Sequence, residues 1–182
     1  MTQASRPELY TRYPVRSILV YNGATVAHYA LGGAGIILGY AGWAGALAGG
    51  LYLAFAFIEM YVHMPLAVCP SCVYYRLEGS RCISALNLVA RRLTAARPTD
   101  EFKNRAAGPL CANNLYIAAL AIPIVAIIPA LFLDFSAWLL GIWFAVLGLM
   151  AFRFFVIFSK VACVHCRAQK VCPQARQMGF GE

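Results

Sequence analysis

The fold is decided by residues 43–66, which read WAGALAGGLYLAFAFIEMYVHMPL and are followed by CPSC at residues 69–72. A helix needs about 20 apolar residues to cross a hydrocarbon core about 30 Å thick, and this stretch is long enough. Three further stretches of this kind lie on either side of it, at residues 17–40, 114–133 and 136–159. The sequence therefore predicts an all-α membrane protein built as a bundle of four transmembrane helices.

The composition agrees with this prediction. Hydrophobic types make up 62% of the 182 residues and charged types 12%, whereas a soluble domain carries about 45–50% apolar and about 25% charged residues. These proportions exclude an ordinary soluble enzyme, a disordered chain and a small secreted disulfide protein. We expect a single membrane domain over residues 1–182. We also expect the first span to be retained rather than cleaved as a signal peptide, because a second span follows it at once.

The connections between the spans alternate in character. Residues 41–42 and 134–135 are tight turns without a basic residue. The segment up to residue 16, the loop 67–113 and the tail 160–182 hold all but one of the 15 Lys and Arg residues. The positive-inside rule then predicts a multi-pass protein, of a bacterial inner membrane, with both termini in the cytoplasm. Orientation and contact with anionic lipid explain the net charge of +8, so we expect no nucleic-acid partner.

The predicted cytoplasmic loop contains one amphipathic pattern, over residues 83–93. One helical face of this segment carries Ile83, Leu86, Val89, Ala90 and Leu93. We expect a short amphipathic helix that lies on the membrane surface. Because so little of the chain lies outside the bilayer, we also expect the protein to be a subunit that has other membrane or cytoplasmic proteins as partners.

Six of the seven cysteines form two groups, one after the second span and one after the fourth. These are Cys69, Cys72 and Cys82, and then Cys163, Cys166 and Cys172. The two spans run in the same direction, so both C-x-x-C pairs emerge on one face of the bundle. The reducing cytoplasm disfavours structural disulfides there, and four thiolates are the ligand set of zinc and of iron–sulfur clusters. The sequence therefore predicts a metal centre held by these cysteines.

The spacing of the cysteines leaves the identity of the metal open. The run C-x2-C-x5-C-P at residues 163–173 departs from the bacterial ferredoxin run C-x2-C-x2-C-x3-C-P. Zinc would need only the four C-x-x-C thiolates, which would leave Cys82, Cys172 and His165 without a role or available for a second site. Cys111 has no partner close in the sequence, and we interpret it as a buried apolar residue.

Ionisable residues inside the predicted spans are candidates for function because they are costly in a bilayer. Glu59 and His63 share a face of the second span, and Arg153 lies at a similar depth in the fourth. We expect an ion pair between Glu59 and Arg153 that either joins two helices or belongs to a quinone or proton site. In the second reading Glu59, His63 and Arg153 are the candidate catalytic residues.

Two more polar side chains are candidates for cofactor binding. Tyr61 is a possible hydrogen-bond donor to a quinone carbonyl. His28 lies in the first span, roughly 12 Å deeper than His63, so one haem bridged by both is not expected. We expect His28 to form a hydrogen bond within the bundle, to Asn22 or a tyrosine. The neighbouring methionines of the second span suit Cu(I) as a further alternative.

The Cys69-Pro70 and Cys172-Pro173 pairs follow the second and fourth helices. This layout resembles that of the four-helix membrane quinol dehydrogenases that serve periplasmic nitrate reductase systems. The resemblance covers the architecture alone. Those proteins have three residues between the cysteines of each motif and carry ferredoxin-type runs that this chain lacks, so no residue role is transferred from them.

Four functions are compatible with these observations. The first is a membrane subunit that passes electrons between the quinone pool and a partner protein. The second is a non-enzymatic anchor or scaffold subunit with a structural zinc site. The third is a quinone-linked thiol–disulfide oxidoreductase, which would need its cysteines on the opposite, oxidising side. The fourth is a metal-ion carrier. The polar residues of the spans favour the first function, and if the chain is an enzyme we expect redox chemistry.

Overall fold

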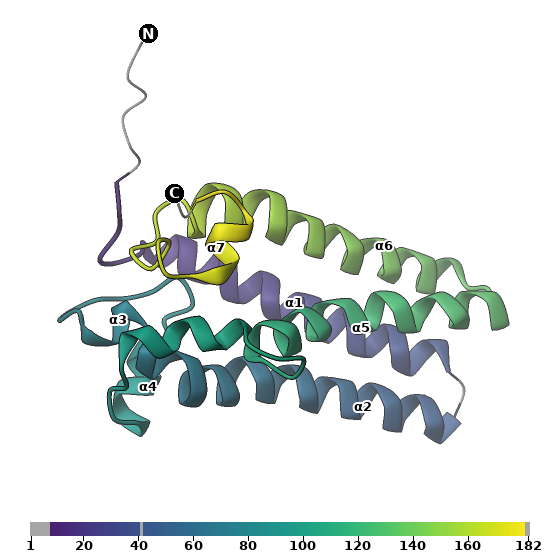
Figure 1. Cartoon of the computed structure of the whole chain (residues 1–182). Helices are drawn as coiled ribbons and strands as arrows, with labels where there is room; N and C mark the ends of the chain where they lie inside the picture. The colour runs from purple at the N-terminus through teal and green to yellow at the C-terminus, as the bar shows by residue number, and fades with distance from the viewer. Residues whose placement is uncertain (1–7, 41, 181–182) are drawn as a thin grey trace, which may run out of the picture.

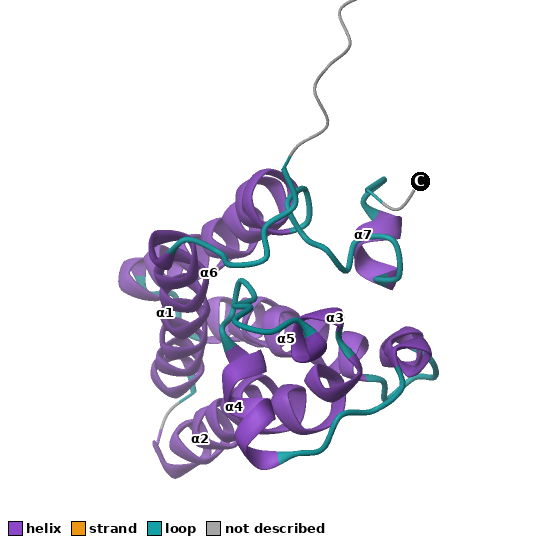
Figure 2. Ribbon diagram, turned by 90° about the vertical axis from the view of Figure 1, so that its left-hand side faces the viewer, coloured by secondary structure: helices purple, strands orange, loops and turns teal. Residues whose placement is uncertain are grey.

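The computed structural model describes residues 8–40 and 42–180 of the chain. Within these ranges the protein is helical, and two isolated bridges are the only β-type pairing. Four long helices run the length of the bundle (Figure 1): α1 (Val15–Gly39), α2 (Gly42–Ile58), α5 (Ala112–Leu133) and α6 (Ala137–Phe152). Three short helices gather at one end of it: α3 (Val73–Arg76), α4 (Leu86–Leu93) and α7 (Pro173–Gln177). In the end-on view of Figure 2, α1 lies between α2 and α6.

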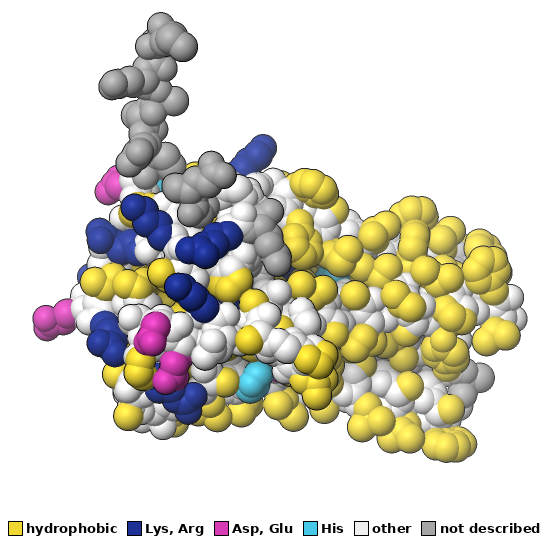
Figure 3. Space-filling model, in the orientation of Figure 1, with side chains coloured by type: hydrophobic (Ala, Val, Ile, Leu, Met, Phe, Trp, Pro, Cys, Tyr) yellow, Lys and Arg dark blue, Asp and Glu magenta, His cyan; other side chains and the backbone are white. Residues whose placement is uncertain are grey.

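Three helical stretches are long and apolar enough to cross a membrane: Gly42–Ser71, Ala112–Leu133 and Ala137–Ala162. Apolar side chains cover the outside of the long helices, whereas Lys and Arg gather at the end that carries the short helices (Figure 3). These features indicate an integral membrane protein in contact with lipid. All but the last residue of the first predicted span lies in α1, which is 25 residues long but falls outside this group of three. The count of four spans therefore stays a prediction.

Glycines allow the backbones of neighbouring helices to approach closely. A Cβ atom added at Gly49 would stand 2.9 Å from the carbonyl oxygen of Gly33, and one added at Gly32 would stand 2.7 Å from the Cβ of Pro123. Any larger residue at these positions would push α1 away from α2 or α5. Small residues of this kind provide the close packing that stabilises helix pairs in membranes, where the hydrophobic effect between helices is weak.

Pro123 leaves a backbone acceptor free inside α5. A proline has no N–H, so the carbonyl of Ala119, four residues earlier, lacks its usual helical partner. The hydroxyl of Tyr52 on α2 donates to this carbonyl at 3.0 Å. The sequence thus opens a backbone hydrogen bond in one helix, and a side chain from the neighbouring helix replaces it.

Both α2 and α6 continue into wider π-helical segments, η1 (Glu59–Val68) and η4 (Arg153–Ala162). Each segment begins at an ionisable residue and leads into a C-x-x-C motif. The N–H groups of Cys69 and Cys163 close the two segments, each by a hydrogen bond to the carbonyl five residues earlier. π-Helical turns are rare and occur frequently at functional sites. Their position therefore points to the cysteine end of the bundle.

The predicted amphipathic helix is present as α4 and begins at Leu86. Its buried side includes Leu86 and Ala90, whereas Val89 and Leu93 are exposed. The apolar face predicted from the sequence is therefore divided between contact with η1 and the protein surface. Contact of the exposed part with the membrane surface stays a prediction. The chain between α4 and α5 forms a 3₁₀ helix, η3 (Thr99–Ala106), anchored by buried Phe102.

Candidate functional site

The two C-x-x-C motifs adopt the same backbone turn. The N–H of Cys72 donates to the carbonyl of Cys69 at 3.0 Å, and the N–H of Cys166 donates to the carbonyl of Cys163 at 3.2 Å. In each motif the carbonyl of the second cysteine then accepts from the N–H three residues later, at 2.9 and 3.2 Å. Two copies of one local geometry, each at the end of a π-helical segment, therefore present four thiols.

The third cysteine of each group comes from less regular structure. The N–H of Cys82 donates to the Oδ1 of Asn87 at 3.1 Å, and its Sγ lies 3.4 Å from the Oγ of Ser84. Cys172 precedes α7, and its N–H donates to the carbonyl of Ala168 at 2.8 Å. These contacts fix the backbone of both residues beside the two C-x-x-C motifs.

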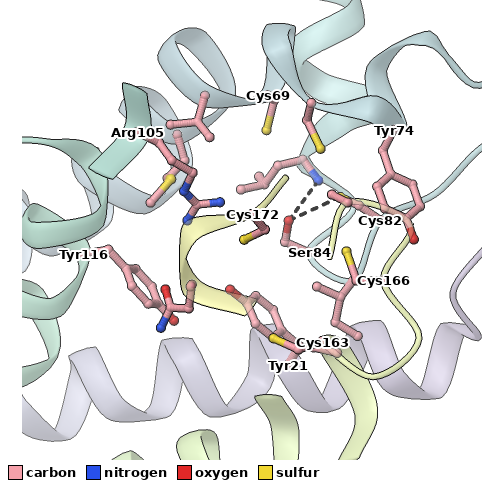
Figure 4. A pocket seen from close by; sticks show the side chains of 18 of the residues that line it. Tyr21, Cys69, Tyr74, Cys82, Ser84, Arg105, Tyr116, Cys163, Cys166 and Cys172 are labelled. Carbon is pink, nitrogen blue, oxygen red and sulfur yellow. Dashed lines mark hydrogen bonds between the residues drawn. The ribbon is translucent and has the colours of Figure 1, made fainter. Parts of the chain in front are cut away.

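One cavity of about 180 Å³ is lined by all six of these cysteines (Figure 4). We call it the thiol cavity. Its cysteines are Cys69, Cys72, Cys82, Cys163, Cys166 and Cys172. Cys111 lies elsewhere, at the N-terminus of α5, where its Sγ accepts from the N–H of Asn114 at 3.4 Å. The structure thus brings together the six cysteines that the sequence grouped and leaves the seventh apart.

The thiols surround a space rather than converge on a point. Within the two described ranges, no three His, Cys, Asp or Glu side chains lie close enough together to hold a single metal ion as they stand. An apolar cavity of about 150 Å³ admits a molecule of benzene. The thiol cavity therefore has room for a group much larger than one ion, with sulfur on several sides of it.

Burial favours the protonated form of three of these thiols, those of Cys72, Cys163 and Cys166. It raises the pKa of Cys72 and of Cys163 to about 12, although the positive charge of Arg105 acts in the opposite direction on both. Burial likewise raises the pKa of Cys166 to about 11. Because metals bind thiolates, loading this cavity with a metal must displace protons from these groups.

The segment before α1 ties the two cysteine regions together. The N–H of Tyr10 donates to the carbonyl of His165 at 2.9 Å, and the N–H of Arg81 donates to the carbonyl of Thr11 at 3.1 Å. The hydroxyl of Tyr74 donates to the carbonyl of Tyr10 at 2.7 Å. His165 itself stacks on the Tyr10 ring, with 4.3 Å between the ring centres, and does not line the thiol cavity.

The predicted ion pair between Glu59 and Arg153 is not formed. Arg153 is fully buried, and its guanidinium donates to the hydroxyls of Tyr116 and Thr25. It also lies over two aromatic rings, 5.1 Å from the centre of Tyr21 and 5.7 Å from that of Tyr116. The physical reason is the packing of η4 against α1, which brings Arg153 to Thr25 of that helix rather than to Glu59 of η1. Tyr21 and Tyr116 in turn line the thiol cavity.

Glu59 is paired within its own helix instead. Its Oε2 lies 2.7 Å from the Nδ1 of His63, and only 3% of its surface is exposed. Its Oε1 has no hydrogen-bond partner among the described residues. His63 is partly exposed and lines a second cavity of about 240 Å³. The two cavities share Val68, Phe102 and Arg105 as lining residues, so they are neighbours.

The other polar candidates of the spans lie away from both cavities. The Nε2 of buried His28 lies 3.0 Å from the carbonyl of Leu120, which joins α1 to α5. The hydroxyl of Tyr61 lies 3.5 Å from the Oδ1 of Asn22, and its ring stacks on Phe57. These contacts give both residues a place in helix packing. The methionines Met60 and Met64 do line the thiol cavity.

Sequence reasoning missed Arg105 and the tyrosines of the thiol cavity. Arg105 served only as one of the basic residues that predict the orientation in the membrane, because no spacing pattern connects residues of η3 with the cysteines. Tyr13 lies just before α1, and Tyr74 follows Cys72 in α3. Aromatic residues near a membrane boundary are common, so neither showed a distinctive signal. The nearest hint in the sequence was that Tyr74 is the second residue after the Cys69–Cys72 motif.

No family model, curated protein or solved structure matches this chain. Its function is therefore inferred from its own residues and their arrangement.

Proposed function

We propose that this protein is an integral membrane electron-transfer subunit that holds an iron–sulfur cluster in the thiol cavity. The observation that carries the proposal is the gathering of six cysteines, from two regions about 90 residues apart in the sequence, around one cavity. Packing of small apolar side chains does not require such a gathering. A shared inorganic group does, because each thiolate supplies one bond to it.

The chemistry of the cavity suits a cluster better than a single zinc ion. Zinc holds its four sulfur ligands about 2.3 Å from one point, whereas the thiols here stand on several sides of a larger space. The matched turns at Cys69–Cys72 and Cys163–Cys166 offer four ligands, the number that the common clusters need. When bound, the group would supply one-electron transfer at this end of the bundle.

The partner for these electrons is proposed to be a quinone. His63 lines the second cavity, which neighbours the thiol cavity. The Nδ1 of its ring lies 2.7 Å from the Oε2 of buried Glu59. A carboxylate that orients a histidine favours proton transfer at the other ring nitrogen. Oxidation of a quinol to a quinone releases two protons and two electrons. His63, which is partly exposed, would accept the two protons in turn and pass each to water, while the two electrons would pass one at a time to the group held in the thiol cavity and on to a protein acceptor.

The orientation forms part of the same proposal. The basic residues lie at the end of the bundle that carries the cysteines (Figure 3). With α1 as a fourth span, this end would face the cytoplasm, where free thiols persist. A scaffold subunit with a zinc site is the competing function, and the metal content decides between the two.

The experiment is elemental analysis of the protein purified without oxygen. We expect iron and acid-labile sulfide together, with broad absorption near about 400 nm. Cys69→Ser and Cys163→Ser should lose the iron, and Cys111→Ser, outside the cavity, is the matched control that should keep it. Zinc without sulfide would overturn the proposal in favour of the scaffold, and equal iron in all three variants would overturn the assignment of the ligands.

A further inference from the structure

Arg105 is the one charged side chain among the described residues that line the thiol cavity, and none of those residues is Asp or Glu. It reaches the cavity from η3, the 3₁₀ helix before α5. Figure 4 shows its guanidinium directed into the space between Cys69 and Cys172. The cavity is therefore lined by sulfur, aromatic and apolar groups, by the neutral polar side chains of Ser84 and Gln174, and by a single cation.

Arg105 is partly buried, and one nitrogen of its side chain lacks an acceptor. Its Nε is buried without a hydrogen-bond partner among the described residues. The centre of the Phe102 ring lies 5.2 Å from the Arg105 Cζ. A buried donor left without an acceptor destabilises a protein by about 1–3 kcal/mol, and by more when it is charged. The structure thus keeps a costly unpaired donor where an acceptor from a ligand would satisfy it.

A thiolate-ligated centre supplies that acceptor. Four thiolates around an iron–sulfur core give it a net negative charge, which is unfavourable in a buried site unless a cation compensates it. Hydrogen bonds to the sulfur atoms and the net charge nearby also set the reduction potential of such a centre. Both effects stabilise the reduced state, because reduction adds one more negative charge.

We propose that Arg105 donates hydrogen bonds to the sulfur atoms of the anionic centre and thereby raises its reduction potential. This inference rests on the proposed function and gives Arg105 the role of a positioning residue rather than a ligand. Phe102 holds it in place, since that ring is 4% exposed and lines the same cavity. Lys103 belongs to the same helix but is exposed and does not line the cavity.

The test is a redox titration of the purified protein followed by electron paramagnetic resonance, with iron measured in each sample. Arg105→Gln should lower the ratio of reduced to oxidised centres by about tenfold at a fixed potential, which is about 59 mV for a one-electron couple. Lys103→Gln removes the same charge from the same helix and should leave the potential unchanged. Arg105→Lys keeps the charge but loses the fork of donors, so its potential should lie between the other two.

Equal potentials in Arg105→Gln and Lys103→Gln would overturn the inference while leaving the cluster itself in place. Loss of iron from Arg105→Gln with retention in Arg105→Lys would support it, because charge compensation is then needed for binding. Loss of iron from all three variants would contradict it, since the site would depend on η3 as a whole. Absence of iron from the unmodified protein would be the failure of the proposed function.

Discussion

Cys69 and Cys163 each have two structural roles. The backbone N–H of each closes a π-helical segment, and the thiol of each lines the thiol cavity. Any change in the register of either segment would therefore move a sulfur atom away from the site. Burial of the thiols has a second consequence, because it keeps them in the protonated form that binds metals least well.

The reactivity of the thiols should follow their raised pKa values. In the metal-free protein, alkylation of Cys163 by iodoacetamide should still be accelerating above pH 10, because its pKa is about 12 and only the thiolate reacts. In the same protein unfolded by denaturant, the rate should level off soon after the ordinary thiol pKa of about 8.5. Mass spectrometry of the labelled peptide measures both curves. A plateau near pH 9 in the folded protein would contradict the burial of this thiol.

At the scale of residues, the sequence predicted which cysteines gather at the site better than it predicted which contacts the ionisable side chains make. The sequence predicted the six cysteines of the site because the clustering of cysteines after two parallel spans is unusual. The pairing of Glu59 with Arg153 was wrong, because similar depth in a membrane does not determine which way a helix face turns. Arg105 was not predicted as a site residue, since its contact with the cysteines depends on the path of the loop before α5.

At the scale of elements, the two π-helical segments are the least expected feature. Both are ten residues long, and both end one residue before the first cysteine of a C-x-x-C motif. The sequence predicts the apolar stretches that contain them, because length and hydropathy suffice for that. It does not predict the wider turn, since the hydrogen-bond register depends on the packing of the segment against its neighbours.

The replacement hydrogen bond at Pro123 allows a direct test of packing between α2 and α5. Tyr52→Phe should destabilise the protein by about 0.5–1.5 kcal/mol, because the carbonyl of Ala119 loses its donor. In a Pro123→Ala background the new N–H of residue 123 donates to the carbonyl of Ala119. Tyr52→Phe should then lower the free energy of unfolding by much less. Unfolding of the four variants in detergent gives the coupling free energy.

Tyr40→Phe is the matched control for this cycle. The hydroxyl of Tyr40 donates to the carbonyl of Ala126 at 2.7 Å, and that carbonyl has an ordinary helical partner four residues later, Ala130. The destabilisation caused by Tyr40→Phe should therefore be the same whether residue 123 is Pro or Ala. If the cost of Tyr52→Phe is also unchanged between the two backgrounds, the hydroxyl does not compensate for the proline.

At the scale of the whole molecule, charge and apolarity are segregated along the bundle. On the face shown in Figure 3, apolar side chains cover the long helices, and Lys and Arg gather at the end that carries the short helices. The composition predicted this separation because membrane proteins need it for both solvation and orientation. The hydrogen bonds by which the segment before α1 joins the two cysteine regions were not predicted, because that segment has no periodic pattern.

The orientation of the bundle can be measured with a membrane-impermeant thiol reagent. Asp134→Cys, in the turn between α5 and α6, should be labelled in intact cells, since Asp134 is exposed at the far end from the cysteines. Lys103→Cys should be labelled only after the membrane is opened. The reverse pattern would place the thiol cavity on the oxidising side and would favour the thiol–disulfide function.

The central claim is that the thiol cavity holds a cluster of iron and sulfide rather than a single ion. X-ray absorption at the iron and zinc edges of the anaerobically purified protein tests it most directly. We predict a first shell of sulfur around iron and a second shell of neighbouring iron, both lost in Cys163→Ser and retained in Cys111→Ser. A protein that contains zinc with one sulfur shell at about 2.3 Å and no second metal shell would contradict the account.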